Sequence, residues 1–74
     1  MKMKEARAKK LYTMRALADV SGVSLATIRN IEQGKVTPSL GVIQKLVTKL
    51  EIDPEEIDEF RMGIEAASRG KKAS

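Results

Sequence analysis

The feature that most limits the fold of this chain is a short break between two helical segments. The stretch from residue 13 to residue 34 reads TMRALADVSGVSLATIRNIEQG. Gly22 can adopt a positive φ without a Cβ clash, so the chain can reverse direction within about three to four residues. Thr13 and Ser24 are predicted N-caps, because their hydroxyl groups can accept hydrogen bonds from the backbone N–H groups of a first helical turn. The stretch therefore predicts two short helices joined by a tight turn.

The second of these helices, from a Ser24 cap to about Gln33, is predicted to have an apolar back and a small or polar front. Ile28 and Ile31 lie at i, i+3 spacing and are expected to face the core. The front presents short or hydrogen-bonding side chains, which suit the major groove of DNA. It consists of Leu25, Ala26, Thr27, Arg29 and Asn30. The predicted core of the two helices consists of Leu17, Ala18, Val23, Ile28 and Ile31.

Several spaced residues in one order resemble the helix-turn-helix of the phage-repressor family, also called the XRE or Cro-like family. The resemblance covers about residues 3 to 60 and is more specific than a lone turn pattern. It implies an all-α, compact five-helix, lambda-repressor-like domain that binds operator DNA. The residues that carry it are Arg7, Leu17, Ala18, Gly22, Val23, Ser24, Ile28, Ile31, Glu32, Gly34, Lys35, Pro38, Ser39 and Leu40.

The resemblance also implies roles for individual residues. The five front residues, Leu25, Ala26, Thr27, Arg29 and Asn30, take the base-contacting positions, where Arg29 can bond guanine and Asn30 adenine. A partly buried ion pair is implied between Arg7 and Glu32, since a guanidinium matches a carboxylate bidentately. Phosphate contacts are implied for Met14 through its backbone N–H, and for Arg15, Ser24, Lys35, Val36 and Thr37.

Three positions in the first part of the chain depart from the family pattern, one of them Tyr12, which stands where the family usually has a leucine. Leu11 stands where the family usually has a glycine, so the turn geometry there is open. Met14 stands where the family commonly has a glutamine that touches the DNA backbone. Arg15 is the expected substitute for that glutamine, and an exposed, solvated charge is the equal alternative.

The segment Asp53-Pro54-Glu55-Glu56 has the pattern of a helix start, with a capping aspartate, a proline at the first position and a glutamate to close a capping box. Ser39 is predicted to cap the helix before it. In the fifth helix, Ile57, Phe60 and Ile64 form an apolar stripe, which we expect to be the interface of a homodimer. For Ile57 and Phe60, sealing the monomer core is the alternative. The domain is predicted to span residues 1–65, followed by a basic, disordered tail at residues 66–74.

Composition limits the function classes. The chain has no Cys and no His, so a thiol nucleophile and the common Cys/His metal sites are excluded, and neither catalysis nor a cofactor or metal is expected. Residues 1–50 carry ten Lys or Arg and three acidic residues, whereas residues 51–65 carry one Arg and seven acidic residues. A basic part can attract phosphate while the acidic part sits away from it. No segment resembles a signal peptide or membrane span, so a cytoplasmic protein of a bacterium or phage, with no membrane partner, is expected.

The sequence therefore predicts a sequence-specific transcriptional regulator, a repressor or controller, that binds double-stranded DNA. We expect a homodimer on a palindromic operator, because relatives bind two half-sites about 34 Å apart. The alternative is a DNA-binding antitoxin or adaptor whose main role is to bind a partner protein. An enzyme is disfavoured, since no nucleophile or phosphate-loop motif is present.

Overall fold

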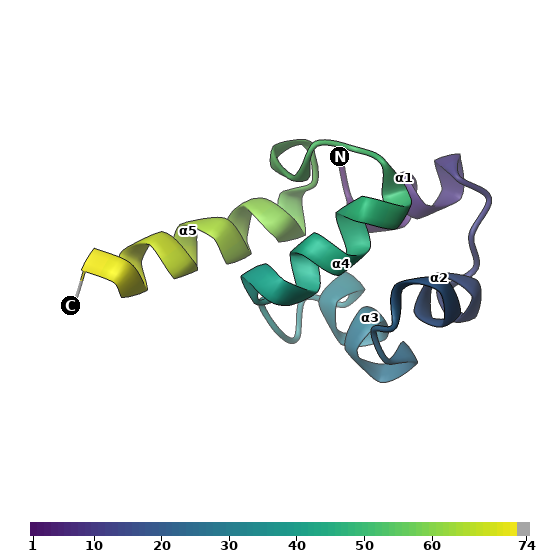
Figure 1. Cartoon of the computed structure of the whole chain (residues 1–74), viewed down its shortest axis with the longest axis horizontal. Coiled ribbons are helices and arrows are strands. Elements are labelled where there is room, and N and C mark those ends of the chain that lie inside the picture. The colour runs from purple at the N-terminus through teal and green to yellow at the C-terminus, as the bar shows by residue number, and fades with distance from the viewer. Residues whose placement is uncertain (73–74) are drawn as a thin grey trace.

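The chain folds as a set of short helices, followed by a longer one. The computed structural model describes the backbone of residues 1–72 and the side chains of residues 1–69. This part of the chain contains five α-helices, one short 3-10 helix and no strand (Figure 1). The elements are α1 (Met3–Lys9), α2 (Met14–Ser21), α3 (Leu25–Glu32), α4 (Leu40–Leu50), the 3-10 helix η1 (Pro54–Glu56) and α5 (Asp58–Lys72). The predicted all-α fold is confirmed.

Side-chain caps begin three helices at the residues that the sequence predicts. In each case the hydroxyl oxygen accepts a hydrogen bond from the backbone N–H three residues further on, at 3.0 to 3.3 Å, and the caps are Thr13, Ser24 and Ser39. Gly22 ends α2 in the left-handed conformation, with φ at 77°. This conformation is inexpensive only for glycine, and it turns the chain directly into α3.

The hydrophobic core lies between the helices and includes most of the residues predicted from helical spacing. The helices α2 and α3 pack on each other, α2 packs on α4, and α5 packs on α4 and α1. Ala18 is half-buried where α2 meets the core. The buried apolar side chains are Met3, Ala6, Leu17, Val23, Ile28, Ile31, Ile43, Leu46, Leu50, Ile57 and Phe60.

The junction before α5 corrects two predictions. The Asp53 carboxylate accepts a hydrogen bond from the Glu55 N–H at 2.9 Å, but the turn that it caps is a 3-10 helix, and the extended residue Ile57 separates this turn from α5. The geometry turns Ile57 and Phe60 into the core, where both are fully buried. Buried side chains offer no surface to a second chain, so the monomer core, and not a dimer interface, is the place of Ile57 and Phe60. Ile64, the third residue of the predicted stripe, is half-buried.

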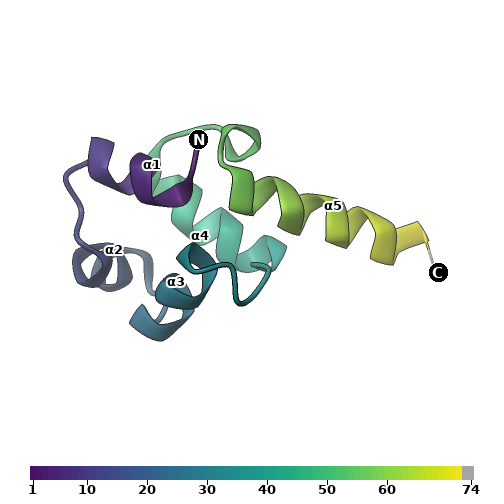
Figure 2. The same ribbon diagram turned by 180° about the vertical axis from the view of Figure 1, so that it is seen from behind.

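The end of the chain also differs from the sequence-based expectation. The helix α5 continues to Lys72, so residues 66–72 are helical where a disordered tail is predicted, and the predicted boundary after residue 65 falls inside this helix. Ala73 and Ser74, the rest of the predicted tail, lie outside the described residues. Two opposite views show the second half of α5 extending beyond the other helices (Figures 1 and 2).

Two contacts hold the first half of α5 against the body. A Cβ at Gly63 would lie 2.3 Å from the Pro38 carbonyl oxygen, so only glycine allows α5 to pack this closely on the loop before α4. The Glu59 carboxylate accepts a hydrogen bond from the Met3 N–H at 2.9 Å and thereby caps α1. These contacts set the direction in which the rest of α5 leaves the body.

The turn between α1 and α2 requires a backbone conformation that favours glycine. Leu11 has φ at 60°, in the left-handed region, and its side chain is 92% exposed. A leucine in this conformation is strained by about 1 to 2 kcal/mol, which glycine would avoid.

The ends of α1 and α4 are joined by an ion pair at the surface. The Lys10 ammonium donates a hydrogen bond to the Glu51 carboxylate. This hydrogen bond and the attraction of the opposite charge raise the pKa of Lys10 and lower the pKa of Glu51. Because the pair faces water, salt screens it and its share of the stability is small.

Candidate nucleic-acid interface

The helix α3 has one side in the core and the other at the surface. Ile28 and Ile31 are fully buried, as predicted. On the opposite side, Ala26 and Arg29 are exposed, whereas Leu25, Thr27 and Asn30 are half-buried. None of the five predicted base-contacting side chains is buried, so the front of α3 is open to a partner. The views of Figures 1 and 2 agree that α3 lies at the edge of the body.

The first turn of α3 is ordered by two hydroxyl groups. The Ser24 hydroxyl accepts from the Thr27 N–H at 3.1 Å and donates to the Thr27 hydroxyl oxygen at 2.8 Å. This reciprocal contact fixes the Thr27 side chain and leaves the hydroxyl hydrogen of Thr27 to donate elsewhere. The start of the helix therefore presents a preorganised polar edge.

The start of α2 offers a backbone group and one cation. Met14 packs its side chain against the core, so only its backbone N–H can face a ligand. Arg15, the residue after Met14, is exposed. The first N–H groups of an α-helix lack intrahelical partners and favour an anion such as phosphate.

The loop after α3 is the third exposed element. Gly34 turns the chain at φ 74°, and the Lys35 N–H then donates to the Asn30 carbonyl oxygen at 2.9 Å. This bond ties the loop to the end of α3. The predicted phosphate-contacting residues Lys35, Val36 and Thr37 are all exposed in it.

An ion pair between α1 and α3 fixes α3 from behind. The Arg7 Nε donates to Glu32 Oε2 at 2.8 Å, and Nη2 donates to Oε1 at 3.0 Å. The two side chains are only 13% and 10% exposed. A third donor of the same guanidinium, Nη1, bonds the Tyr12 carbonyl oxygen at 3.0 Å, a contact that the sequence does not predict. The carboxylate of Glu32 is thus used inside the domain.

Exposed cations lie on the three elements that carry the predicted contact residues. Arg15, Arg29 and Lys35 lie on α2, α3 and the loop that follows. The helix η1, which contains Glu55 and Glu56, is at the side of the molecule away from α3 in both views (Figures 1 and 2), whereas Asp58 and Glu59 at the start of α5 line a pocket together with Gln33 and Gly34 at the end of α3. A polyanion at the front of α3 would therefore be attracted by the cations of α2, α3 and the following loop and would lie away from the acidic residues of η1.

Within the described residues, no three or more His, Cys, Asp or Glu side chains are grouped to hold a metal ion. None of the helices there combines the length and the apolar character that crossing a membrane requires.

The helices α2 and α3 are short and meet at a glycine turn, and α3 has its back in the core and its front uncovered. This arrangement defines the class of helix-turn-helix DNA-binding proteins. A family model described as "Helix-turn-helix" matches residues 3–57, from the start of α1 to the residue that follows η1. The chain belongs to this XRE-type (Cro-like) family of DNA-binding regulators. Neither a curated protein nor a solved structure gives a significant match.

Proposed function

We propose that this chain is a sequence-specific transcriptional regulator, a repressor or controller, that reads double-stranded DNA with α3 in the major groove. The observation that carries the proposal is the division of α3 into a fully buried back, Ile28 and Ile31, and a front of five unburied residues. A helix held in this way can enter the groove without unfolding its own core.

Base readout is assigned to the front of α3. Arg29 is exposed and can bond guanine O6 and N7, while Asn30 can bond adenine N6 and N7. Ala26 and the Thr27 methyl group suit the methyl group of thymine. Leu25 adds an apolar contact at the start of the helix. Because only one front residue is charged, specificity depends on apolar fit and DNA shape as well as on hydrogen bonds.

Affinity is assigned to phosphate contacts on either side of α3. The backbone N–H of Met14, the side chains of Arg15 and Ser24, and the loop Lys35–Val36–Thr37 are the groups for this role. Contacts to phosphate release counterions, so binding should weaken steeply as salt increases.

A short recognition helix reads only a few base pairs, so a single domain gives limited discrimination. Two copies on a palindromic operator, with half-sites about 34 Å apart, would double the number of base contacts. We therefore propose a homodimer as the DNA-binding form.

Selection of bound sequences from a pool of random duplexes tests the proposal. The expected result is one enriched motif with two inverted halves. The logarithm of the association constant should fall linearly with the logarithm of the salt concentration. Ala26→Glu places a negative charge on the exposed front and should abolish enrichment. Gln44→Glu, the same charge change on the exposed side of α4, is the matched control and should retain it. Absence of any enriched motif, or unchanged enrichment with Ala26→Glu, would overturn the proposal.

A further inference from the structure

The front of α3 is divided along its length into an apolar part and a polar part. Its first turn carries Leu25, Ala26 and Thr27, and none of these residues is charged. Arg29 and Asn30 follow one turn later. Successive residues of a helix are about 100° apart, so Leu25 and Thr27 lie on either side of Ala26. Ala26 is exposed and its side chain is a single methyl group, so the first turn presents a shallow surface with little polarity.

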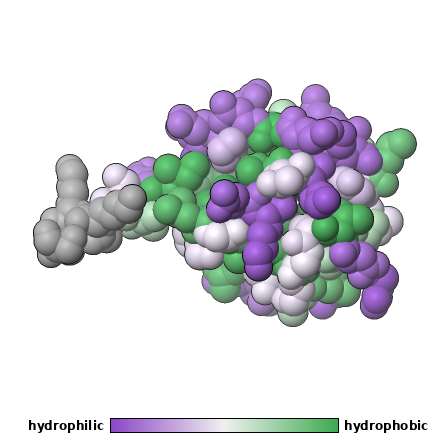
Figure 3. All heavy atoms as spheres, in the orientation of Figure 1, coloured by the Kyte–Doolittle hydropathy of each residue, from purple (hydrophilic) through white to green (hydrophobic). Residues whose placement is uncertain are grey.

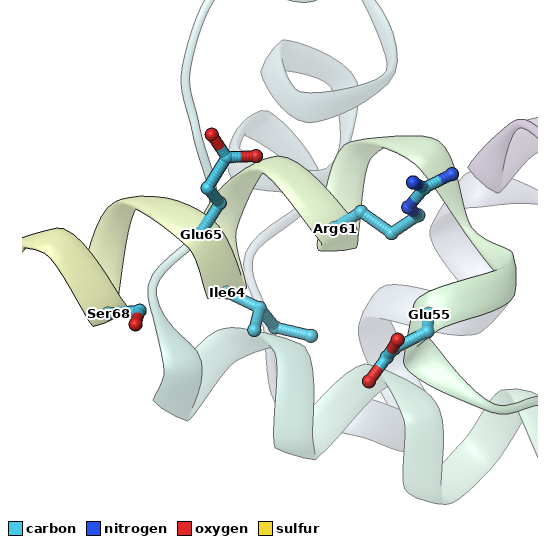
Figure 4. A pocket seen from close by; sticks show the side chains of 5 residues that line it. All are labelled: Glu55, Arg61, Ile64, Glu65 and Ser68. Carbon is cyan, nitrogen blue, oxygen red and sulfur yellow. The ribbon is translucent and has the colours of Figure 1, made fainter.

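The surface of the body as a whole is in keeping with this division. In Figure 3, the lower edge, where α2 and α3 lie, is mostly pale, whereas hydrophilic side chains dominate the upper edge over η1 and α1. A hollow on the other side of the body also has apolar surface, and it is lined by Glu55, Arg61, Ile64, Glu65 and Ser68 (Figure 4). Two carboxylates in that hollow would repel a polyanion. The first turn of α3 is therefore the apolar surface that is placed to meet DNA.

Ser24 holds the Thr27 side chain in one orientation. The Ser24 hydroxyl accepts from the Thr27 N–H at 3.1 Å and donates to Thr27 Oγ1 at 2.8 Å. Because Oγ1 and the methyl group are attached to the same tetrahedral Cβ, the bond that draws Oγ1 toward Ser24 also fixes the methyl group, which points away from Ser24. The oxygen of Thr27 is thus engaged within the protein, and its methyl group adds to the apolar surface of the first turn.

The base edges in the major groove offer many hydrogen-bonding groups but one apolar group, the C5-methyl group of thymine. 5-Methylcytosine carries the same methyl group on the same ring atom. Contact between this group and an apolar side chain is favourable, because it removes apolar surface of both partners from water. Leu25 and Ala26 have no side-chain donor or acceptor for the polar groups of any base. The first turn of α3 is therefore complementary to a methylated pyrimidine.

We propose that the first turn of α3 reads the C5-methyl group of a pyrimidine, with Thr27 as the residue that determines this specificity and Ser24 as its positioning residue. This assignment rests on the proposed function and deepens it, because it names the chemical group that is read. It also makes binding responsive to the methylation of cytosine. Ser24 thereby affects base discrimination through Thr27, in addition to its proposed contact with phosphate.

Duplexes that differ by one methyl group test this assignment. Each thymine of the selected duplex is replaced in turn by uracil, and the dissociation constant is measured by fluorescence anisotropy at a fixed salt concentration. The methyl ratio is the dissociation constant without the methyl group divided by the constant with it. At one position of each half-site we expect a methyl ratio of about four, which corresponds to the burial of one CH₂-sized group. At the same position, cytosine and 5-methylcytosine should give a similar methyl ratio.

Two substitutions of Thr27 separate the role of its methyl group from that of its hydroxyl. Thr27→Ser keeps the oxygen and removes the methyl group, so the methyl ratio should fall below about two. Thr27→Val places methyl groups on two of the three positions at Cβ, with χ1 restricted by the helix, and should keep the methyl ratio of the wild type. The reverse result, a ratio kept by Thr27→Ser and lost by Thr27→Val, would show that the hydroxyl is the reading group and would overturn the proposal.

Substitutions of Ser24 test its positioning role. Ser24→Ala leaves Thr27 free to occupy a second χ1 rotamer, so the methyl ratio should fall, and Ser24→Thr, which restores a hydroxyl, should recover it. A phosphate contact alone would weaken binding to both members of a pair equally and leave the ratio unchanged. Ser39→Ala removes the corresponding hydrogen bond at the start of α4, 3.3 Å long, and is the matched control that should keep the ratio. Circular dichroism melts check that every variant is folded.

Three results would overturn the proposal. They are a methyl ratio of one at every thymine for the wild type, an unchanged ratio in Thr27→Ser, and an unchanged ratio in Ser24→Ala. Discrimination of thymine from uracil without discrimination of 5-methylcytosine from cytosine would overturn the response to cytosine methylation. An enriched motif that is bound equally with and without each methyl group would refute this inference alone, whereas the absence of any enriched motif would refute the proposed function.

Discussion

The guanidinium of Arg7 on α1 binds the carboxylate of Glu32 at the end of α3 through two parallel hydrogen bonds, at 2.8 and 3.0 Å. The same guanidinium bonds the Tyr12 carbonyl oxygen in the loop that leads to α2. One side chain therefore links α1, the loop before α2 and α3. Because both charges are largely removed from water, each depends on the other for compensation.

Loss of this pair should destabilise the domain. Arg7→Ala strands the Glu32 carboxylate, and we expect the free energy of unfolding to fall by about 3 kcal/mol. Arg7→Lys keeps the charge but loses the bidentate geometry and the bond to Tyr12, so a smaller loss of about 1 to 2 kcal/mol is expected. Urea denaturation followed by circular dichroism measures both. Arg15→Ala, which removes an exposed arginine, is the control and should stay within about 0.5 kcal/mol of the wild type. Wild-type stability of Arg7→Ala would show that the pair has no structural role.

The strained turn at Leu11 gives a prediction of the opposite sign. Leu11→Gly removes the left-handed strain at φ 60° without loss of buried surface, since the side chain is 92% exposed. Glycine also adds freedom to the unfolded chain, so we expect a net gain of about 0.5 to 1 kcal/mol in the free energy of unfolding. Leu11→Ala keeps a Cβ in the same conformation and should bring no such gain. Equal thermal midpoints for Leu11→Gly and the wild type would argue against strain at this turn.

Two helical glycines should respond differently to the same substitution. Gly63→Ala places a Cβ 2.3 Å from the Pro38 carbonyl oxygen, so α5 must shift, and we expect a loss of about 2 kcal/mol. Gly41→Ala meets only the Ser39 hydroxyl oxygen at 4.0 Å. In that position alanine should stabilise α4 by about 0.5 to 1 kcal/mol. Thermal unfolding of the two variants measures the contrast, and a gain for both would show that α5 does not pack tightly at Gly63.

Local chemistry made the central part of the fold predictable. The caps Thr13, Ser24 and Ser39 and the turn at Gly22 are short-range signals, and each is found where the sequence predicts it. The burial of Ile28 and Ile31 followed from their spacing on one helix. These features require no knowledge of distant contacts.

The last part of the chain was predictable only in outline, because it depends on long-range packing. Asp53 and Pro54 correctly indicate a helical turn, but sequence spacing does not reveal that Ile57 is extended or that Ile57 and Phe60 are both fully buried. The hydrogen bond from Met3 to Glu59 spans most of the chain and was likewise missed. Gly63 inside a helical pattern is a signal for close approach that could have been used.

In the candidate site, too, some features follow from the local sequence and others do not. Helical periodicity predicts which side of α3 faces outward, whereas the roles of Arg15, Lys35 and the loop came from the resemblance and stay predictions. The groove around Ile64 could not be derived from the apolar stripe alone, because the stripe does not tell which members the monomer buries.

Binding of Arg29→Ala to the selected duplex and to a panel of duplexes with single base changes tests the central claim most directly. If the front of α3 reads bases, this variant loses about 1 to 3 kcal/mol on the selected site and no longer discriminates at one base step. Lys35→Ala, in contrast, should weaken binding to every duplex to a similar extent and reduce the salt slope by about one. The account is contradicted if Arg29→Ala keeps the full base preference of the wild type at every position of the panel.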